Sequence, residues 1–151
     1  PYDDKAWVAM PAFNLDVALI HATRADERGV CEIASPDHYM DDWFARASAH
    51  TVVSVDKMVD STYFNDPEVA RRVYWERNVT SQVVHLEGGA HPSSSDPLYG
   101  FDVSHYKTYG GLIAEGGYAA WADAFLGDSE ADYQSKVGGL DAIHQLALPA
   151  Y

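Results

Sequence analysis

The chain has 151 residues, of which 47% are hydrophobic and 22% are charged, and these values match one globular domain and exclude a disordered chain or a coiled coil. Ten Lys and Arg residues against 23 Asp and Glu residues give a net charge of −13, so nucleic acid is not an expected partner. No apolar run approaches the roughly 20 residues that span a bilayer. We therefore expect a soluble protein with no membrane partner. The lone Cys31 cannot form an internal disulfide, which fits a cytoplasmic location.

Four short segments have the composition of β-strands. Asp16–Ala22 is a nearly continuous apolar run rich in branched residues, the pattern of a central strand buried on both faces of a parallel sheet. A helix with a cap at Asp37 is expected over 38–48, between two of the strands, and this order predicts a right-handed crossover unit. We therefore expect an α/β fold built on an open, mostly parallel sheet with helices on both faces. The expected strands are Asp16–Ala22, Val30–Ala34, Thr51–Val55 and Gln82–Leu86.

The second half of the chain predicts helices and one unusual segment. Ser93–Gly111 is rich in Ser, Pro, Gly and Tyr and shows neither the helical nor the strand period, so we expect a long irregular loop, which in a compact domain is usually functional. Ser129 is an expected helix cap with Asp132 at the capping-box position, and Gly138 and Gly139 would stop that helix. The expected helices are Asp66–Arg77, Gly117–Leu126, Ser129–Val137 and Asp141–Leu148.

The seven histidines do not follow known metal-binding patterns. They form no H-x3-H or H-E-x2-H pair, and Cys31 has no second cysteine near it, so no metal site is predicted. His21 and His85 lie at the carboxyl ends of expected strands, the side on which open α/β sheets place their ligand crevice. Either these two side chains line such a crevice, or each is a polar residue satisfied at a strand end.

The segment Glu-Gly-Gly-Ala-His-Pro at 87–92 follows an expected strand directly. Two glycines allow backbone N–H groups to approach a ligand, and the Glu87 carboxylate and the His91 imidazole could serve acid, base or covalent chemistry. The alternative is a tight turn in which Gly88 and Gly89 adopt positive φ and His91 caps or packs.

Hydroxyl groups are frequent in the irregular segment. Ser93, Ser94 and Ser95 lack the G-x-S-x-G elbow, so they indicate loop polarity more than nucleophiles. Tyr99, Tyr106 and Tyr109 could line a pocket, but packing against a partner is the simpler interpretation. The fingerprints of a dinucleotide site and of a Walker phosphate site do not occur.

Four stretches stand out together: PAFNLDVALIHATRADERG at 11–29, TVVSVDKMV at 51–59, VVHLEGGAHPSSSDPLYGFD at 83–102 and DYQSKVGG at 132–139. In order and approximate spacing they resemble the A (alpha) subunits of class I coenzyme A transferases, above all the glutaconate type. Family A subunits are longer, and the segment at Pro1 corresponds to the middle of a subunit. Since the chain also begins with proline and not methionine, residues 1–151 are expected to be the C-terminal half of such a subunit.

The resemblance implies one component of a hetero-oligomeric enzyme that moves coenzyme A between carboxylic acids. In the family, a glutamate of the B (beta) subunit forms the anhydride and glutamyl-CoA intermediates, so Glu87 is only a weak candidate for a catalytic residue. The implied contribution of this chain is Gly88, Gly89, Ala90, His91 and Pro92, near the cleft between the subunits. The substrate would be a coenzyme A thioester, with no tightly bound cofactor, and the partners would be the missing N-terminal half together with a B subunit.

Two alternatives stay open at this point. One is a family relative that hydrolyses a CoA-linked ring or diketone, as in steroid breakdown. The other is a non-catalytic domain in which Ser93–Gly111 serves only assembly.

Overall fold

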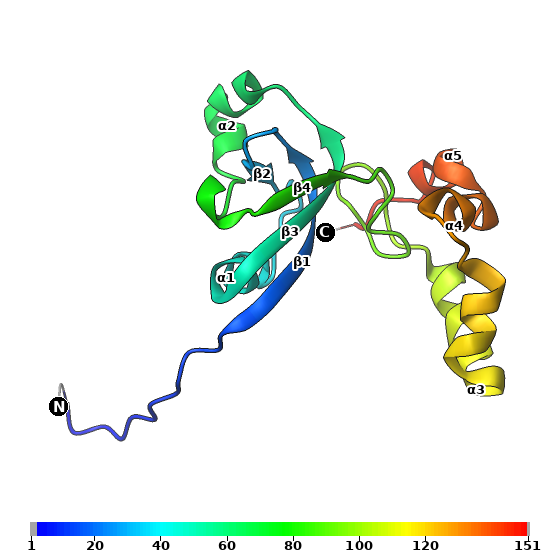
Figure 1. The fold of residues 1–151 in the computed structure, drawn as a ribbon, viewed down its shortest axis with the longest axis horizontal. Helices are drawn as coiled ribbons and strands as arrows, with labels where there is room; N and C mark the ends of the chain where they lie inside the picture. The colour runs from blue at the N-terminus through cyan, green and yellow to red at the C-terminus, as the bar shows by residue number, and fades with distance from the viewer. Residues whose placement is uncertain (1–2, 151) are drawn as a thin grey trace.

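A computed structural model describes residues 3–150, so the expectation attached to Pro1 lies outside the described residues. Its centre is a four-stranded sheet in the order β2-β1-β3-β4 (Figure 1). The β1–β3 and β3–β4 pairs are parallel, and only the short β2 runs antiparallel to β1. The expected α/β class with an open, mostly parallel sheet is therefore confirmed. The strands are β1 (Leu15–Ala25), β2 (Cys31–Glu32), β3 (Ser48–Met58) and β4 (Gln82–His85).

One face of the sheet forms the hydrophobic core. Alternate residues of the two central strands, Ile20 on β1 with Val53 and Val55 on β3, are buried there. Helix α1 (Asp41–Ala47) packs on this face through Ala45, which is completely buried. The parallel β1–β3 pairing and the intervening α1 agree with the expected crossover unit.

The opposite face of the central strands is apolar but open. Leu19 is 80% exposed, and Val17 and Val84 are also exposed, although all three lie within strands. Buried positions on one face thus alternate with exposed apolar positions on the other, so the expectation that Asp16–Ala22 is buried on both faces is wrong for this chain by itself. An apolar strip of this kind indicates a surface that another layer can cover.

Two helix expectations in the first half are corrected. Helix α1 begins at Asp41 behind Met40, and the expected cap Asp37 instead accepts a hydrogen bond from the Tyr39 N–H in a turn. The helix expected over Asp66–Arg77 is reduced to α2 (Pro67–Ala70), flanked by the 3₁₀ turns η1 (Ser61–Asn65) and η2 (Arg77–Val79). The chain leaves the helical path because the Arg72 carbonyl accepts from the Ile33 N–H at 3.1 Å.

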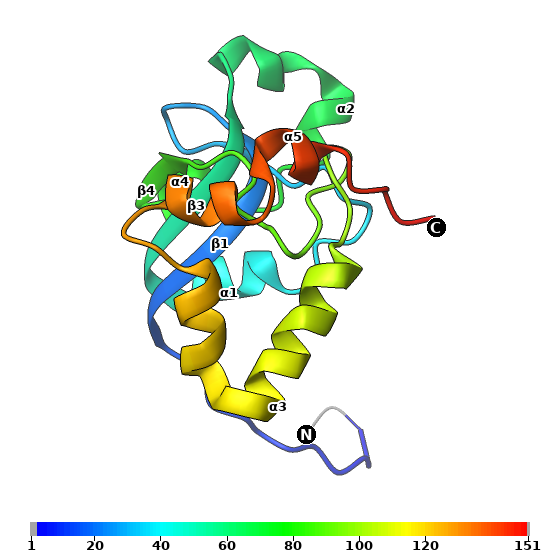
Figure 2. The ribbon, with the colours of Figure 1, turned by 90° about the vertical axis from the view of Figure 1, so that its right-hand side faces the viewer.

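The segment expected to be irregular over Ser93–Gly111 is irregular only as far as Asp102. There the Asp102 side chain accepts from the His105 N–H at 2.7 Å and caps α3 (Val103–Phe125), so the expectation is wrong from Val103 onward. Gly117, at φ 70°, breaks α3 into the two arms that Figure 2 shows. The expected helix Gly117–Leu126 corresponds to the second arm.

The last two helices, α4 and α5, agree better with the helices expected from the sequence. The Ser129 hydroxyl accepts from the Asp132 N–H at 3.2 Å and caps α4 (Glu130–Lys136), as expected. Gly138, at φ 100°, separates α4 from α5 (Gly139–His144), which begins at Gly139 with φ 85° and is shorter than expected. Helices α3, α4 and α5 group on one side of the molecule, joined to the sheet through residues 86–102 (Figure 1). None of the helices in the described part of the chain has the length and apolar character needed to cross a membrane.

Candidate active-site cleft

Asp56, near the carboxyl end of β3, is the centre of a buried hydrogen-bond network. Its carboxylate lies 2.9 Å from His21 Nε2, 2.8 Å from the Gly88 N–H, 2.5 Å from Ser95 Oγ and 3.1 Å from Tyr99 Oη. The carboxylate is fully buried, and its partners come from β1 and from the segment after β4. The network therefore attaches residues 88–99 to the carboxyl side of the central strands.

Asp56 is held in its ionised form. Burial acts to raise its pKa, but the hydrogen bonds from His21 and Ser95, the nearby imidazole and the Gly88 N–H outweigh burial and lower the pKa. An ionised carboxylate only accepts hydrogen bonds, so His21 Nε2 carries a proton and donates it to this bond. The other ring nitrogen, Nδ1, lies 2.9 Å from Ser54 Oγ.

Ser95 does not have the geometry of a serine nucleophile activated by histidine, and Ser54, which lies beside His21 Nδ1, is not among the residues that line the neighbouring cleft. Such a nucleophile donates its hydroxyl proton to a ring nitrogen, whereas Ser95 donates to Asp56. Both ring nitrogens of His21 are already engaged. Ser95 and His21 therefore both bind the Asp56 carboxylate and hold it in place.

Three backbone N–H groups of the turn at 88–92 donate hydrogen bonds to other groups of this chain. The Gly88 N–H donates to Asp56, the Gly89 N–H to the Leu86 carbonyl, and the Ala90 N–H to the Tyr99 hydroxyl. Gly88 has φ 78°, and a Cβ there would lie 3.0 Å from Leu140 Cδ2 of α5. Both glycines are packed against their surroundings, and Gly88 has the positive φ of the tight-turn alternative whereas Gly89 does not. The Gly88 and Gly89 N–H groups are bonded within this chain in this arrangement.

A cleft of about 360 Å³ opens beside the network. His21 and Ser95 connect it to Asp56, and Ala90 is the one residue of the 88–92 turn that lines it. The remaining lining residues come from the β1–α1 region and from the irregular segment: Thr23, Ile33, Ser35, Asp37, Tyr39, Asp41, Ser93, Ser94, Asp96 and Phe101. This cleft lies at the carboxyl side of parallel strands, where open α/β sheets bind ligands.

His91 and Pro92 line a second cavity of about 460 Å³, between the turn, α3 and α4. His91 Nε2 lies 3.2 Å from Asp102 and Nδ1 lies 2.7 Å from the Tyr133 hydroxyl. Burial acts to raise the pKa of Asp102, but hydrogen bonds from the His105 N–H and from His91 lower it, so Nε2 donates to the carboxylate and Nδ1 accepts from Tyr133. Burial and nearby carboxylates raise the pKa of Tyr133 to about 12.

His91 is therefore a buried connector, with its side chain only 1% exposed and both nitrogens engaged. Glu87 points elsewhere, since its carboxylate pairs with His144 of α5 at 3.1 Å. The structure thus divides the predicted cleft residues: Ala90 lies on one cavity, His91 and Pro92 on another, and the glycines are packed against leucine side chains.

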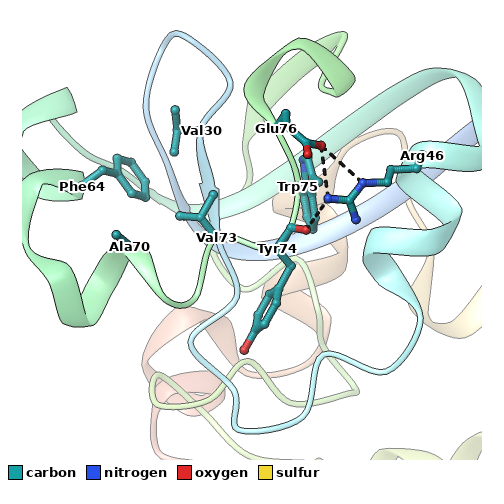
Figure 3. Close-up of a pocket in the computed structure, with 8 residues that line it drawn as sticks. All are labelled: Val30, Arg46, Phe64, Ala70, Val73, Tyr74, Trp75 and Glu76. Atoms are coloured by element: carbon teal, nitrogen blue, oxygen red, sulfur yellow. Dashed lines mark hydrogen bonds and ion pairs between the residues drawn. The ribbon is translucent and has the colours of Figure 1, made fainter.

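A third hollow lies on the α1 side of the sheet (Figure 3). Phe64 and Val73 form its apolar part, and Arg46 pairs with Glu76 at 3.2 Å beside Trp75. It contains no histidine, cysteine or hydroxyl nucleophile other than the Tyr74 phenol. Arg46 also donates to the Tyr74 carbonyl at 2.9 Å, so this hollow lies where α1 contacts residues 74–76.

The other residues singled out in the sequence, His85 and three tyrosines, lie outside the lining of the cleft. His85 Nε2 bonds the Asp56 carbonyl at 3.0 Å, as a polar residue satisfied at a strand end. Tyr99 is buried in the network, whereas Tyr106 and Tyr109 are exposed on α3. Among residues 3–150, no three His, Cys, Asp or Glu side chains are arranged to hold a metal ion.

The central residue Asp56 was not among the predicted site residues. It comes directly after the expected strand Thr51–Val55, and His21 is the second-last residue of the expected strand Asp16–Ala22, so both lie at strand ends. The strand-end rule that selected His21 and His85 would also have selected Asp56.

Known proteins resemble the chain in sequence, although no family model matches it. The sequence is 29% identical over 136 residues to the cholesterol ring-cleaving hydrolase IpdA subunit of Mycobacterium tuberculosis, a match that covers 89% of this chain and 47% of that protein. It is 27% identical over 149 residues to the A subunit of glutaconate CoA-transferase from Acidaminococcus fermentans, covering 94% of this chain and 44% of the relative.

The crystal structure of glutaconate coenzyme A-transferase from Acidaminococcus fermentans has the same fold. It superimposes with a TM-score of 0.76 at 24% identity and covers 87% of this chain and 41% of that chain. The chain is a relative of CoA-transferase A subunits. The resemblance seen in the sequence is thereby confirmed, and this A-subunit relative spans less than half the length of the proteins it matches.

Proposed function

We propose that this chain forms one wall of the active-site cleft of an enzyme that moves coenzyme A between carboxylic acids. The observation that carries the proposal is the cleft of about 360 Å³ at the carboxyl side of the sheet, in a relative of CoA-transferase A subunits. The proposed substrate is an acyl-CoA thioester, and no tightly bound cofactor is needed. The proposed partners are the remainder of the A subunit together with a B subunit.

Three candidate nucleophiles of this chain are already engaged in contacts within it, which supports a nucleophile supplied from outside this chain. The Ser95 hydroxyl is bonded to Asp56, the Asp56 carboxylate is buried among four donors, and Glu87 pairs with His144. A carboxylate engaged in this way is a poor nucleophile. We therefore assign the covalent step to a glutamate of the proposed B subunit.

The proposed reaction has two halves. The partner's glutamate adds to the thioester carbonyl and expels CoA thiolate, giving a mixed anhydride. The thiolate then adds to the glutamyl carbonyl, which releases the first carboxylate and leaves a glutamyl-CoA thioester. An acceptor carboxylate reverses both steps and leaves as the new acyl-CoA.

This chain would contribute position and hydrogen bonds to that reaction. The Asp56 network fixes the segment 88–99, and the side chains of Ser93 and Ser94 line the cleft. Donors fixed in advance near a thioester carbonyl stabilise the oxyanion that forms on it.

Hydrolysis of a CoA-linked ring or diketone is a second candidate function. It is favoured by the similarity to the Mycobacterium tuberculosis relative, a cholesterol ring-cleaving hydrolase component that matches 89% of this chain. Such a reaction consumes one water and requires no carboxylic acid acceptor.

Product analysis of the assembled enzyme separates these functions. An acyl-CoA and, in a separate reaction, a CoA-linked cyclic diketone are each incubated with a ¹³C-labelled carboxylic acid in ¹⁸O-water, and all thioesters and acids are identified by mass spectrometry. Transfer predicts labelled acyl-CoA at constant total thioester. Hydrolysis predicts incorporation of ¹⁸O without ¹³C-labelled thioester. The absence of both products would contradict the proposal and favour an assembly role.

A further inference from the structure

We infer that the subunit that supplies the nucleophilic glutamate docks on an exposed apolar rim beside the cleft of about 360 Å³. This inference rests on the proposed function, because it names the surface by which the partner binds at that same cleft. The rim consists of two short stretches, one at the start of α1 and one at the start of α3. Its six residues, all exposed, are Tyr39, Met40, Trp43, Phe44, Phe101 and Val103.

The first stretch of the rim is an apolar surface at the start of α1. The N–H groups of Trp43 and Phe44 both donate to the Met40 carbonyl, so one helical turn brings these three residues together. Trp43 is 67% exposed, and Met40 and Phe44 are exposed as well. Helix α1 contributes Ala45 to the core of the sheet instead. The large side chains of this stretch therefore add little to the packing of this chain.

Tyr39 connects this first stretch to the cleft. It lines the cleft and is 80% exposed, and its backbone has φ 50°. A tyrosine in this region of φ is strained, and strain of this kind is concentrated at ligand and partner sites. Within this chain the strained backbone presents an aromatic ring to solvent. The ring is therefore available for a contact with another molecule at the mouth of the cleft.

The second stretch of the rim comes from the other half of the chain. Phe101 lines the same cleft as Tyr39, and Val103, two residues later, is the first residue of α3. Both are exposed, whereas Asp102 between them is engaged with His91 and caps α3. Exposed apolar side chains from two distant segments thus meet at one cleft.

The composition of the rim is that of a protein–protein interface. Tryptophan, tyrosine, phenylalanine and methionine are enriched in such interfaces, and aromatic residues often contribute most of the binding energy. The open face of the sheet differs, because its exposed residues Val17, Leu19 and Val84 are aliphatic and lie within parallel strands. Parallel sheets are normally covered on both faces by helices of their own chain. We therefore assign that face to the remainder of the A subunit and the rim to the B subunit.

The proposed chemistry requires close contact at this place. A nucleophile must come within about 3 Å of the thioester carbonyl, so the chain that carries it must reach the residues around the cleft. Water that entered the closed cleft would hydrolyse the mixed anhydride and the glutamyl-CoA thioester. Apolar side chains packed around the point of contact exclude water from it. The rim thus serves both the attachment of the partner and the protection of the intermediates.

Binding of the two subunits tests the inference without reference to catalysis. In the full-length A subunit, Trp43→Glu and Phe101→Glu should each raise the Kd for the purified B subunit about thirtyfold or more. The matched variant Tyr118→Glu changes an exposed aromatic residue on the second arm of α3, outside the rim and the cleft. It should change the Kd by less than about threefold. A wild-type Kd in both rim variants, each with a normal thermal midpoint, would overturn the inference.

Photo-crosslinking identifies what covers the rim and retains a large aromatic side chain there. Trp43 is replaced by p-benzoylphenylalanine in the full-length A subunit, the enzyme is assembled and irradiated, and the crosslinked peptides are mapped by mass spectrometry. We expect a crosslink to the B subunit. A crosslink within the same A subunit, or to a second A subunit, would overturn the inference.

Failure of the proposed function has a different result. If the full-length A subunit binds no B subunit, the proposed function is wrong and the inference falls with it. If the assembled enzyme converts acyl-CoA while both rim variants bind the B subunit normally, only the inference is wrong.

Discussion

Ser95 Oγ lies 2.5 Å from Asp56 Oδ2, so a hydroxyl of the irregular segment is bonded to a carboxylate near the end of the central strand β3. The two residues are 39 positions apart in the chain. Their contact, with the Gly88 N–H bond to the same carboxylate, fixes the segment that closes the cleft. It also engages a hydroxyl that lies with His21 in the lining of the same cleft.

Replacement of Asp56 by asparagine should destabilise the protein strongly. An amide offers one acceptor oxygen and adds two donors, while four donors point at this position. We expect Asp56→Asn to lower the free energy of unfolding by about 3 kcal/mol, measured by urea denaturation. The matched variant Asp123→Asn should change it by less than about 0.5 kcal/mol, and similar losses in the two variants would contradict the network described above.

Lowering the pH should decrease the free energy of unfolding, because Asp56 and Asp102 become protonated. Both carboxyl groups have a pKa lowered in the folded state, below the unfolded value of about 3.9. Their contribution is therefore complete above roughly pH 5 and is lost as pH falls through the folded pKa values. Urea denaturation from pH 7 to pH 3 should show that the free energy of unfolding of the wild type declines below about pH 4. In Asp56→Asn the free energy of unfolding should depend less steeply on pH. Parallel curves for the two proteins would show that Asp56 is not the group involved.

Substitution of Gly89 should affect folding more than catalysis. A Cβ at this position would lie 2.9 Å from Leu86 Cγ, Cδ2 and O, and the Gly89 N–H already donates to the Leu86 carbonyl. For Gly89→Ala we expect a loss of about 1–2 kcal/mol in stability and a kcat within about threefold of wild type. A fall in kcat of about a hundredfold at unchanged thermal midpoint would instead indicate a lost oxyanion donor.

Tyr39 combines a strained backbone with a place on the cleft. It has φ 50°, a region that favours glycine, and its N–H is held by the Asp37 side chain. Tyr39→Gly should stabilise the fold or leave it unchanged, because relief of this strain is worth about 1 kcal/mol, while kcat/KM for acyl-CoA falls. Tyr39→Phe, which keeps the ring, should retain most of the activity; a normal kcat/KM in Tyr39→Gly would remove the residue from the site.

The strands were predictable because their signal is local. Asp16–Ala22 and Thr51–Val55 carry the branched apolar residues that a buried parallel sheet requires, and both are central strands in the structure. The Ser129 cap was predictable for the same reason, since the hydrogen bond joins residues three positions apart.

The remaining features depend on contacts between distant residues. The first arm of α3 contains Gly110 and Gly111 and shows no clear helical period, so its sequence alone did not indicate a helix. The helix expected after Asp66 ends early because residue 72 bonds to residue 33. Asp56 had no recognisable motif, because its partners lie 32 to 43 positions away along the chain.

The most direct test of the proposed mechanism locates the covalent intermediate. The assembled enzyme is incubated with an acyl-CoA, the intermediate is trapped with hydroxylamine or borohydride, and peptides of all chains are mapped by mass spectrometry. We predict modification of one glutamate on the partner chain, with every carboxylate of this chain unmodified. A modified Glu87, or any other labelled carboxylate of residues 1–151, would contradict the proposal that this chain positions the substrate and the partner supplies the nucleophile.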